Sequence, residues 1–374
     1  MEFYGGYLLA GLHFSFPMDD PYIHLSMGRN LAYHGNWGPM ANVFNSSSSS
    51  ILYTLLIAAF YFVGFGGIST LFIINIVSSM GCLFAFEKIV RSMGLDSDKY
   101  IIVAFAFVIV VPLYHVAYLS MEHTLHIWLI LITLLKAAKY FSEKKNDFKS
   151  LISLSIFTSL TIMARYETLF LGLIIGLLLL YRKQFLYAII FGVIALLPIG
   201  IFGYISVLNG EHWLPNSVLV KGTKSGDGII YYLKYLGRWA KKVIELPEYG
   251  VGFAIVLTTL IWKIKLRSRD TMFWFSLIVA LLFIFHGSFA EVGWLGRYEA
   301  YLIALSMVSF IFIVQKFEEM VKWKFMIYLI IALFFIIRTI PYTYNYRYAM
   351  SNIYDQQIQM SRFVKEYYNH SDIV

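Results

Sequence analysis

Long apolar runs separated by short polar segments dominate the chain. A helix needs roughly 20 predominantly apolar residues to cross the hydrocarbon core of a bilayer. Runs close to this length fall at 68–90, 100–118, 122–140, 183–208, 251–266, 271–287, 297–315 and 322–340. Together with the two halves of the segment 151–181, they predict an all-α polytopic membrane protein with a bundle of about ten transmembrane helices.

Two further apolar runs are too short to span a bilayer comfortably. Residues 3–16 form either a truncated first span or a misplaced start, and no charged region or cleavage site marks them as a signal peptide. Residues 51–63 end at a glycine-rich break, so we expect them to lie in the membrane interface. The first external loop, 17–67, is then expected to contain juxtamembrane helices.

The segment 151–181 is interrupted halfway by Arg165-Tyr166-Glu167. Each half has about 14 residues and reaches only about 21 Å, against a hydrocarbon core of about 30 Å. Arg165 and Glu167 are therefore expected to lie below the external surface, facing a water-filled cavity. A purely structural ion pair is the alternative, although ionisable residues at membrane depth are by default candidates for a functional site.

Composition agrees with the membrane class and excludes others. Apolar residues make up 59% of the chain and charged residues 14%, with a mean hydropathy of +0.68, outside the range of soluble domains. The net charge of +8 comes from short Lys and Arg clusters between apolar runs, as expected for orienting charges rather than for nucleic-acid binding. The single cysteine, Cys82, excludes an internal disulfide and a cysteine-based metal cage.

Positive charge predicts the orientation, because cytoplasmic loops are enriched in Lys and Arg. The clusters fall on alternate sides of successive spans, at 88–99, 144–149, 182–183, 263–269 and 316–324. The loops around Asp19-Asp20, Glu122-His123 and Arg165-Glu167, the long loop 209–249 and the segment 291–299 are then external. This assignment requires that 51–63 does not cross the membrane.

Asp19 and Asp20 are adjacent carboxylates in a chain where charge is scarce. Asp20 followed by Pro21 also resembles a helix start, with the carboxylate as the N-cap and proline at the first helical position. Capping accounts for Asp20 but not for Asp19, and it can coexist with a catalytic role of Asp20.

Several short motifs resemble the external loops of the C-type (GT-C) membrane glycosyltransferases, such as protein O-mannosyl-, aminoarabinose and arabinofuranosyl transferases. Tyr166 departs from the proline usual at its position, and no Pro-Pro-Leu precedes the expected interfacial helix. The matching motifs, in chain order, are Asp19-Asp20-Pro21-Tyr22-Ile23, Gly35-Asn36-Trp37-Gly38, Ser120-Met121-Glu122-His123-Thr124, Ala164-Arg165-Tyr166-Glu167, Leu214-Pro215-Asn216-Ser217 and Gly296-Arg297-Tyr298.

The resemblance implies an enzyme that moves a sugar from a polyprenyl-phosphate donor to an acceptor hydroxyl on a glycan, lipid or protein, with inversion, at the external face of the cell membrane. An acidic residue of the first loop would act as general base, and we favour Asp19 because Asp20 also serves as a cap. The pair could instead hold a divalent cation such as Mg, Mn or Ca, since carboxylates suit hard cations. Glu122 could share either task.

Stabilising the phosphate leaving group requires positive charge on the same face. Arg165 and Arg297 are favoured, because the guanidinium fork matches phosphate. The remaining residues expected to bind substrate are His123, Glu167, Asn216 and Lys221, of which Lys221 is better explained as a solvated loop charge.

Two other functional classes stay open. One is a transporter or flippase of lipid-linked saccharides, which would place ionisable residues at the bilayer midplane and often show inverted repeats; the other is an O-antigen-type polymerase or ligase. In either case, residues 1–340 form the expected transmembrane module. Residues 341–374 are expected to be an external amphipathic segment that begins a further soluble domain, with a strand starting at Ile373-Val374.

Overall fold

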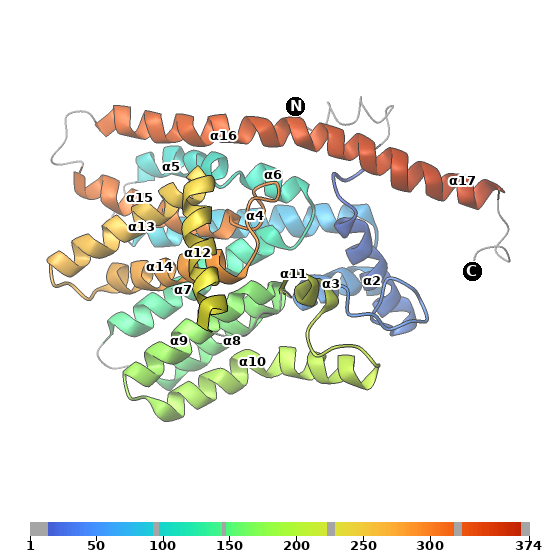
Figure 1. Ribbon diagram of the computed structural model, residues 1–374, viewed down its shortest axis with the longest axis horizontal. Coiled ribbons are helices and arrows are strands. Elements are labelled where there is room, and N and C mark those ends of the chain that lie inside the picture. Colours follow the sequence, from blue (N-terminus) through green and yellow to red (C-terminus); the bar gives the residue numbers. More distant parts are fainter. Residues whose placement is uncertain (1–13, 93–96, 144–146, 223–228, 318–323, 368–374) are drawn as a thin grey trace.

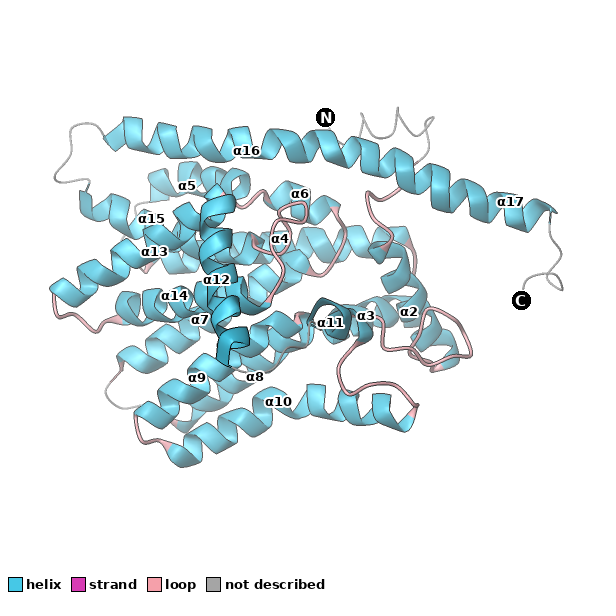
Figure 2. Ribbon diagram, viewed as in Figure 1, coloured by secondary structure: helices cyan, strands magenta, loops and turns pink. Residues whose placement is uncertain are grey.

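The computed structural model describes residues 14–92, 97–143, 147–222, 229–317 and 324–367, and all regular structure in these ranges is helical (Figure 2). The helices of the first half are α2 (Asp20–His34), α3 (Ile51–Phe62), α4 (Ile68–Arg91), α5 (Ser97–Val110), α6 (Leu113–Tyr118), α7 (His123–Ser142), α8 (Phe148–Ala164), η1 (Tyr166–Thr168) and α9 (Leu169–Tyr181). Those of the second half are α10 (Phe185–Leu208), α11 (Asn216–Gly222), α12 (Ile229–Glu245), α13 (Pro247–Lys265), α14 (Thr271–Phe289), α15 (Ala300–Phe317), α16 (Lys324–Ile353), η2 (Tyr354–Gln359) and α17 (Met360–Tyr367).

Several of these helices are long and apolar enough to cross a bilayer, as in a multi-pass membrane protein. Within the described residues these are α4, α7, α10 and α14, and a fifth span results if α12 and α13, which meet at a bend of 107°, are counted as one. The structure thus supports four or five candidate spans rather than the predicted ten. The difference arises because the other predicted spans form helices that are short, interrupted or partly outside the described residues.

The predicted span 100–118 illustrates the interruption. It is divided into α5 and α6 by Val111-Pro112, where Pro112 takes a positive φ of 20°. Proline lacks the amide proton that would continue the helix. The break at Arg165 confirms the expectation for 151–181, because α8 ends at Ala164 and α9 begins at Leu169. The run 3–16 falls almost wholly outside the described residues.

The core is built on α7, α14 and α15. The apolar window of α7 is 72% buried and that of α14 67% buried, whereas that of α10 is 17% buried. Residues 300–309 of α15 are all buried. Because α10 exposes large apolar side chains such as Leu186 and Ile189, it is suited to face lipid rather than water.

The helices of the bundle end at two opposite faces (Figure 1). The C-terminal ends of α7, α9 and α13 lie on the left of the view, where Lys139, Arg182 and Lys265 are found. Helices α2 and α3 lie at the opposite, right-hand end with the connection from α10 to α11. The predicted alternation of basic and external connections therefore agrees with the arrangement of these helices.

A long helical rod crosses the top of the bundle in Figure 1. Helix α16 continues through the π-helical turn η2 into α17, and the rod extends past the end that carries α2. The amphipathic segment predicted after residue 340 is thus helical and continuous with the preceding helix. Ile373-Val374, where a strand was predicted, lies outside the described residues.

Candidate active site

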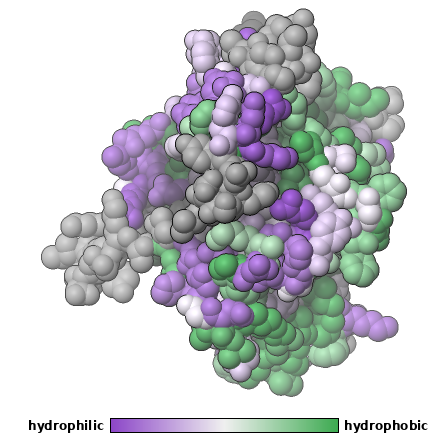
Figure 3. All heavy atoms as spheres, turned by 90° about the vertical axis from the view of Figure 1, so that its right-hand side faces the viewer, coloured by the Kyte–Doolittle hydropathy of each residue, from purple (hydrophilic) through white to green (hydrophobic). Residues whose placement is uncertain are grey.

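Helix α2 positions the first carboxylates at the end of the bundle that Figure 3 faces, where hydrophilic side chains gather in the middle and hydrophobic ones at the lower and right borders. The helix begins at Asp20, and Asp19 stands at the cap position without a capping side-chain hydrogen bond. The N-cap role predicted for Asp20 is therefore wrong. Instead, Asp20 Oδ2 accepts a hydrogen bond of 2.9 Å from Arg297 Nη1.

Glu122 lies in the tight connection between α6 and α7, where Ser120 adopts a positive φ of 54°. The Tyr53 hydroxyl donates to the Ser120 carbonyl at 2.8 Å, which ties this connection to α3. Glu122 is completely buried. A fully buried carboxylate requires charged or hydrogen-bonding partners to be stable in its ionised form.

Arg165 supplies the main partner of Glu122. Its Nη1 donates to Glu122 Oε1 at 2.8 Å, while Nη2 and Nε donate to the two Glu167 oxygens at 2.6 and 3.2 Å. Nη1 also lies 2.9 Å from His123 Nδ1. The guanidinium is thus occupied by two carboxylates, which makes Arg165 first of all a structural charge.

Burial alone would raise the pKa of the Glu122 carboxyl, but Arg165 and the nearby His24 hold that pKa well below its usual range. His24 Nε2 lies 3.4 Å from Glu122 Oε2, and its Nδ1 lies 3.4 Å from Ser48 Oγ. The carboxylate is therefore kept ionised by opposite charge and hydrogen bonding in spite of its burial.

Arg297 approaches the same region from the connection between α14 and α15. In this segment the Gly293 amide donates to Glu299 Oε2 at 2.9 Å. Besides Asp20, Arg297 contacts Tyr298, whose hydroxyl accepts from Nη2 at 3.0 Å. The Arg297 side chain is only 6% exposed, yet its Nε has no hydrogen-bond partner within the described part of the chain. Arg297 thus retains a buried donor that a bound anion could use.

These side chains surround one small cavity of about 50 Å³ at the right-hand end of the bundle, which leaves room for only a few water molecules. Its lining residues are Asp20, Ile23, His24, Ser47, Ser48, Ser49, Met121, Glu122, Arg165, Ser217, Arg297 and Tyr298. We call it the central cavity.

The other predicted site residues lie nearby or elsewhere. Asp19 is exposed and lines two other cavities, described below. His123 contacts Arg165, and Asn216 donates from its side chain to Glu211 at 2.9 Å. Lys221 falls in α11, and its side chain lies outside the described part of the structure.

Sequence reasoning missed several lining residues. His24 stands four positions after Asp20, a spacing that places both on one face of a helix, and this signal could have identified it. Ser217, rather than Asn216, reaches the central cavity from the Leu-Pro-Asn-Ser motif. The three lining serines precede α3, where Ser50 caps the helix by accepting from the Tyr53 amide.

A shared cation site on Asp19 and Asp20 does not fit this geometry. The two carboxylates line different cavities, and Asp20 is engaged by Arg297. Among the described residues, no group of three or more His, Cys, Asp or Glu side chains is arranged to hold a metal ion.

No protein-family model matches the chain, and searches of curated proteins and of solved structures find no match.

Proposed function

We propose that this protein is an integral membrane glycosyltransferase of the GT-C type, which transfers a sugar from a polyprenyl-phosphate donor to an acceptor hydroxyl. The observation that carries the proposal is the convergence of Asp20, Glu122, Arg165 and Arg297 on one cavity. These residues come from four separate external segments of the sequence. The short motifs that contain them, in the order in which they occur, support the same class.

In this proposal Asp20 is the general base, in place of the Asp19 favoured from sequence. The Asp20 carboxylate takes the proton of the acceptor hydroxyl as the hydroxyl oxygen bonds to the anomeric carbon of the sugar. The bond between that carbon and the phosphate oxygen breaks, with inversion, and the lipid phosphate leaves with the bonding electrons. Asp20 is 36% exposed on its side chain, so an acceptor can reach it.

Arg297 is the proposed stabiliser of the leaving phosphate. Its planar guanidinium suits phosphate oxygens, and its Nε is available for a further hydrogen bond. Arg165 has both edges occupied by Glu122 and Glu167, so its proposed task is to fix the wall of the cavity. Electrostatic stabilisation by preorganised donors is often the largest single contribution to catalysis.

The central cavity is too small for a sugar, so the proposal requires that donor binding widens it. The connection from α14 to α15 is the segment suited to move, because Gly293, Leu295 and Gly296 all adopt positive φ values. Glycine tolerates this region at little cost, which permits rearrangement there. Closure after binding would exclude water from the reacting sugar.

The proposed site faces the periplasm or exterior of the cell membrane. Counting α5, α8, α9, α15 and α16 with the four long helices and the α12–α13 pair, the bundle would hold about ten spans, with 1–340 as the catalytic module and the loops 17–67 and 209–249 outside. The acceptor, a glycan, lipid or protein, would arrive from that side, and membrane lipids would surround the bundle.

The direct test is incubation of the purified protein with a panel of polyprenyl-phosphate sugars and acceptors, comparing wild type with Asp20→Asn and Asp19→Asn. We expect donor consumption that Asp20→Asn abolishes. Movement of a labelled lipid-linked sugar across a vesicle membrane without bond cleavage would overturn the proposal in favour of a flippase.

A further inference from the structure

Two grooves meet at Asp19 beneath the C-terminal rod. The first, of about 530 Å³, lies between the segment Gly293–Leu295 and the part of α16 from Asn345 to Ile353. The second, of about 520 Å³, lies between the first turns of α2 and the residues from Gln357 to Arg362. Since Asp19 lines both, we call them together the Asp19 groove. Its helical wall from 345 to 362 is about 27 Å long at 1.5 Å per residue.

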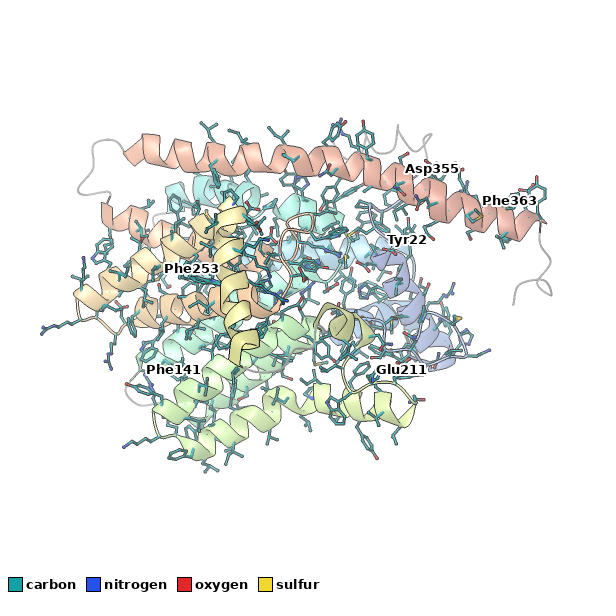
Figure 4. All side chains as sticks on the ribbon, viewed as in Figure 1. Tyr22, Phe141, Glu211, Phe253, Asp355 and Phe363 are labelled. Atoms are coloured by element: carbon teal, nitrogen blue, oxygen red, sulfur yellow. The ribbon has the colours of Figure 1, made fainter. Side chains whose placement is uncertain are left out.

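The wall of the Asp19 groove is anchored on the bundle. Tyr346 and Met350 are fully buried beneath it. The Ser15 hydroxyl donates to the Met350 carbonyl at 2.7 Å, and the Tyr118 hydroxyl lies 2.9 Å from Met350 Sδ. Figure 4 shows Tyr22 on α2 beside the η2 segment that carries Asp355. The helix that forms the wall of the groove is thus fixed to the bundle by buried contacts.

The groove is lined largely by apolar side chains, with the charged Asp19 and Arg362, an exposed aromatic ring and several neutral hydrogen-bonding groups. The Trp294 indole is 59% exposed. Asn345, Asn352 and Gln357 are exposed and offer side-chain amides, each of which can donate and accept. An indole face packs well against the C–H face of a sugar ring, while amides suit hydroxyl groups that are both donors and acceptors.

We propose that the Asp19 groove binds the acceptor, and that the acceptor is an extended carbohydrate chain. This inference rests on the proposed function and names its acceptor class. The wall is a helix whose backbone groups are already paired within the helix, so it offers no free strand edge to a peptide. A ligand in this groove therefore contacts side chains alone, and the amides of Asn345, Asn352 and Gln357 suit its hydroxyls.

The Asp19 groove and the central cavity are separated by a thin partition. Met18 lines the groove, and its Sδ lies 3.0 Å from Arg297 Nη1, which lines the central cavity. Ile23 lines both the central cavity and the second part of the groove. A hydroxyl at the end of a bound chain is therefore one side chain away from Asp20, the proposed base.

The test measures binding without the donor, so that it is independent of transfer. The full chain in lipid nanodiscs is presented to immobilised neutral oligosaccharides of glucose, mannose and N-acetylglucosamine, and to unstructured peptides of similar length. Trp294→Ala and Asn352→Leu alter the groove. Trp213→Ala is the matched control, because Trp213 is 52% exposed in another external connection and lines none of the cavities described.

We expect at least one oligosaccharide to bind, and each groove variant to weaken it about tenfold, a loss of about 1.4 kcal/mol. Trp213→Ala should bind as wild type does. Binding of peptides only, of no oligosaccharide, or of oligosaccharide equally well by Trp294→Ala would overturn the inference. Donor consumption that depends on Asp20 would still stand in that case, so the two proposals fail separately.

Discussion

Asp20 and Arg297 are joined by a hydrogen bond of 2.9 Å across 277 positions of the sequence. This pair connects the start of α2 to the segment between α14 and α15. It places one partly exposed carboxylate and one buried guanidinium side by side in the lining of the central cavity. This one hydrogen bond therefore positions both of the groups that the proposed sugar transfer would need.

Replacing Asp20 with asparagine keeps the shape of the side chain and removes its basicity. We expect the turnover number to fall by about 10² to 10⁴, the usual contribution of a general base. Asp19→Asn is the comparison, because Asp19 lines the proposed acceptor groove and not the central cavity, so its turnover number at saturating acceptor should stay within a few-fold of wild type. Steady-state assays at saturating donor and acceptor make the comparison, and full turnover by Asp20→Asn would contradict the assignment.

The two arginines should respond differently to substitution. Arg297→Lys keeps the charge and loses the planar fork, so we expect a weaker interaction with the donor phosphate and a normal thermal midpoint. Arg165→Met leaves the buried Glu122 and the half-buried Glu167 without their shared partner, at a cost of about 3 to 5 kcal/mol. Unfolding in detergent distinguishes them, and equal stability of the two variants would show that Arg165 has no structural task.

Acid should destabilise the protein partly through Glu122. Because the pKa of the Glu122 carboxyl is well below its usual range in the folded state, its contribution to stability is complete above the ordinary value of about 4.3 and is lost as pH falls toward the folded value. We expect Glu122→Gln to be less stable near neutral pH and to lose less stability on acidification. Thermal midpoints across that range measure the difference, and parallel curves for both proteins would contradict it.

Close packing of α2 on α3 depends on Gly28. A Cβ at this position would stand 2.4 Å from Ile57 Cγ2, and Ile57 is fully buried. We expect Gly28→Ala to destabilise the protein by about 1 to 3 kcal/mol, the usual cost of overpacking. Gly176→Ala in α9 is the matched control, since nothing lies within 4 Å of its Cβ, and it should be neutral or stabilising by up to about 1 kcal/mol.

Cysteine labelling tests the predicted orientation. Cys82 is buried and should not react with a membrane-impermeant maleimide in intact cells. In a Cys82→Ser background, His212→Cys, after α10, should be labelled from outside, and Ser150→Cys, at the start of α8, only after the cells are opened. Both native residues are exposed, so the reverse pattern would invert the topology.

Local features could be predicted from sequence, whereas features that depend on distant partners could not. Long apolar runs in the sequence predict the helices α4, α7, α10 and α14. The charged residues that interrupt the apolar segment 151–181 predict the break at Arg165. Which of the two carboxylates lines the central cavity could not be predicted, because neighbouring residues at a helix start point about 100° apart, and Asp20 is the one that contacts Arg297. Only four or five of the ten predicted spans are long enough to cross a bilayer within the described residues, because hydropathy alone does not register interruptions such as the one at Pro112 that divides α5 from α6.

The ion pair between Arg165 and Glu167 has a consequence for how the chain enters the membrane. In the proposed topology the connection of α8 to α9 crosses the bilayer, and because it carries its own counterion two residues away, its tip is close to neutral. An unpaired arginine at the centre of a membrane helix adds about 2.5 to 3.5 kcal/mol to the cost of insertion. The α8–α9 pair can thus insert as one unit during synthesis, without waiting for Glu122 to reach its final position.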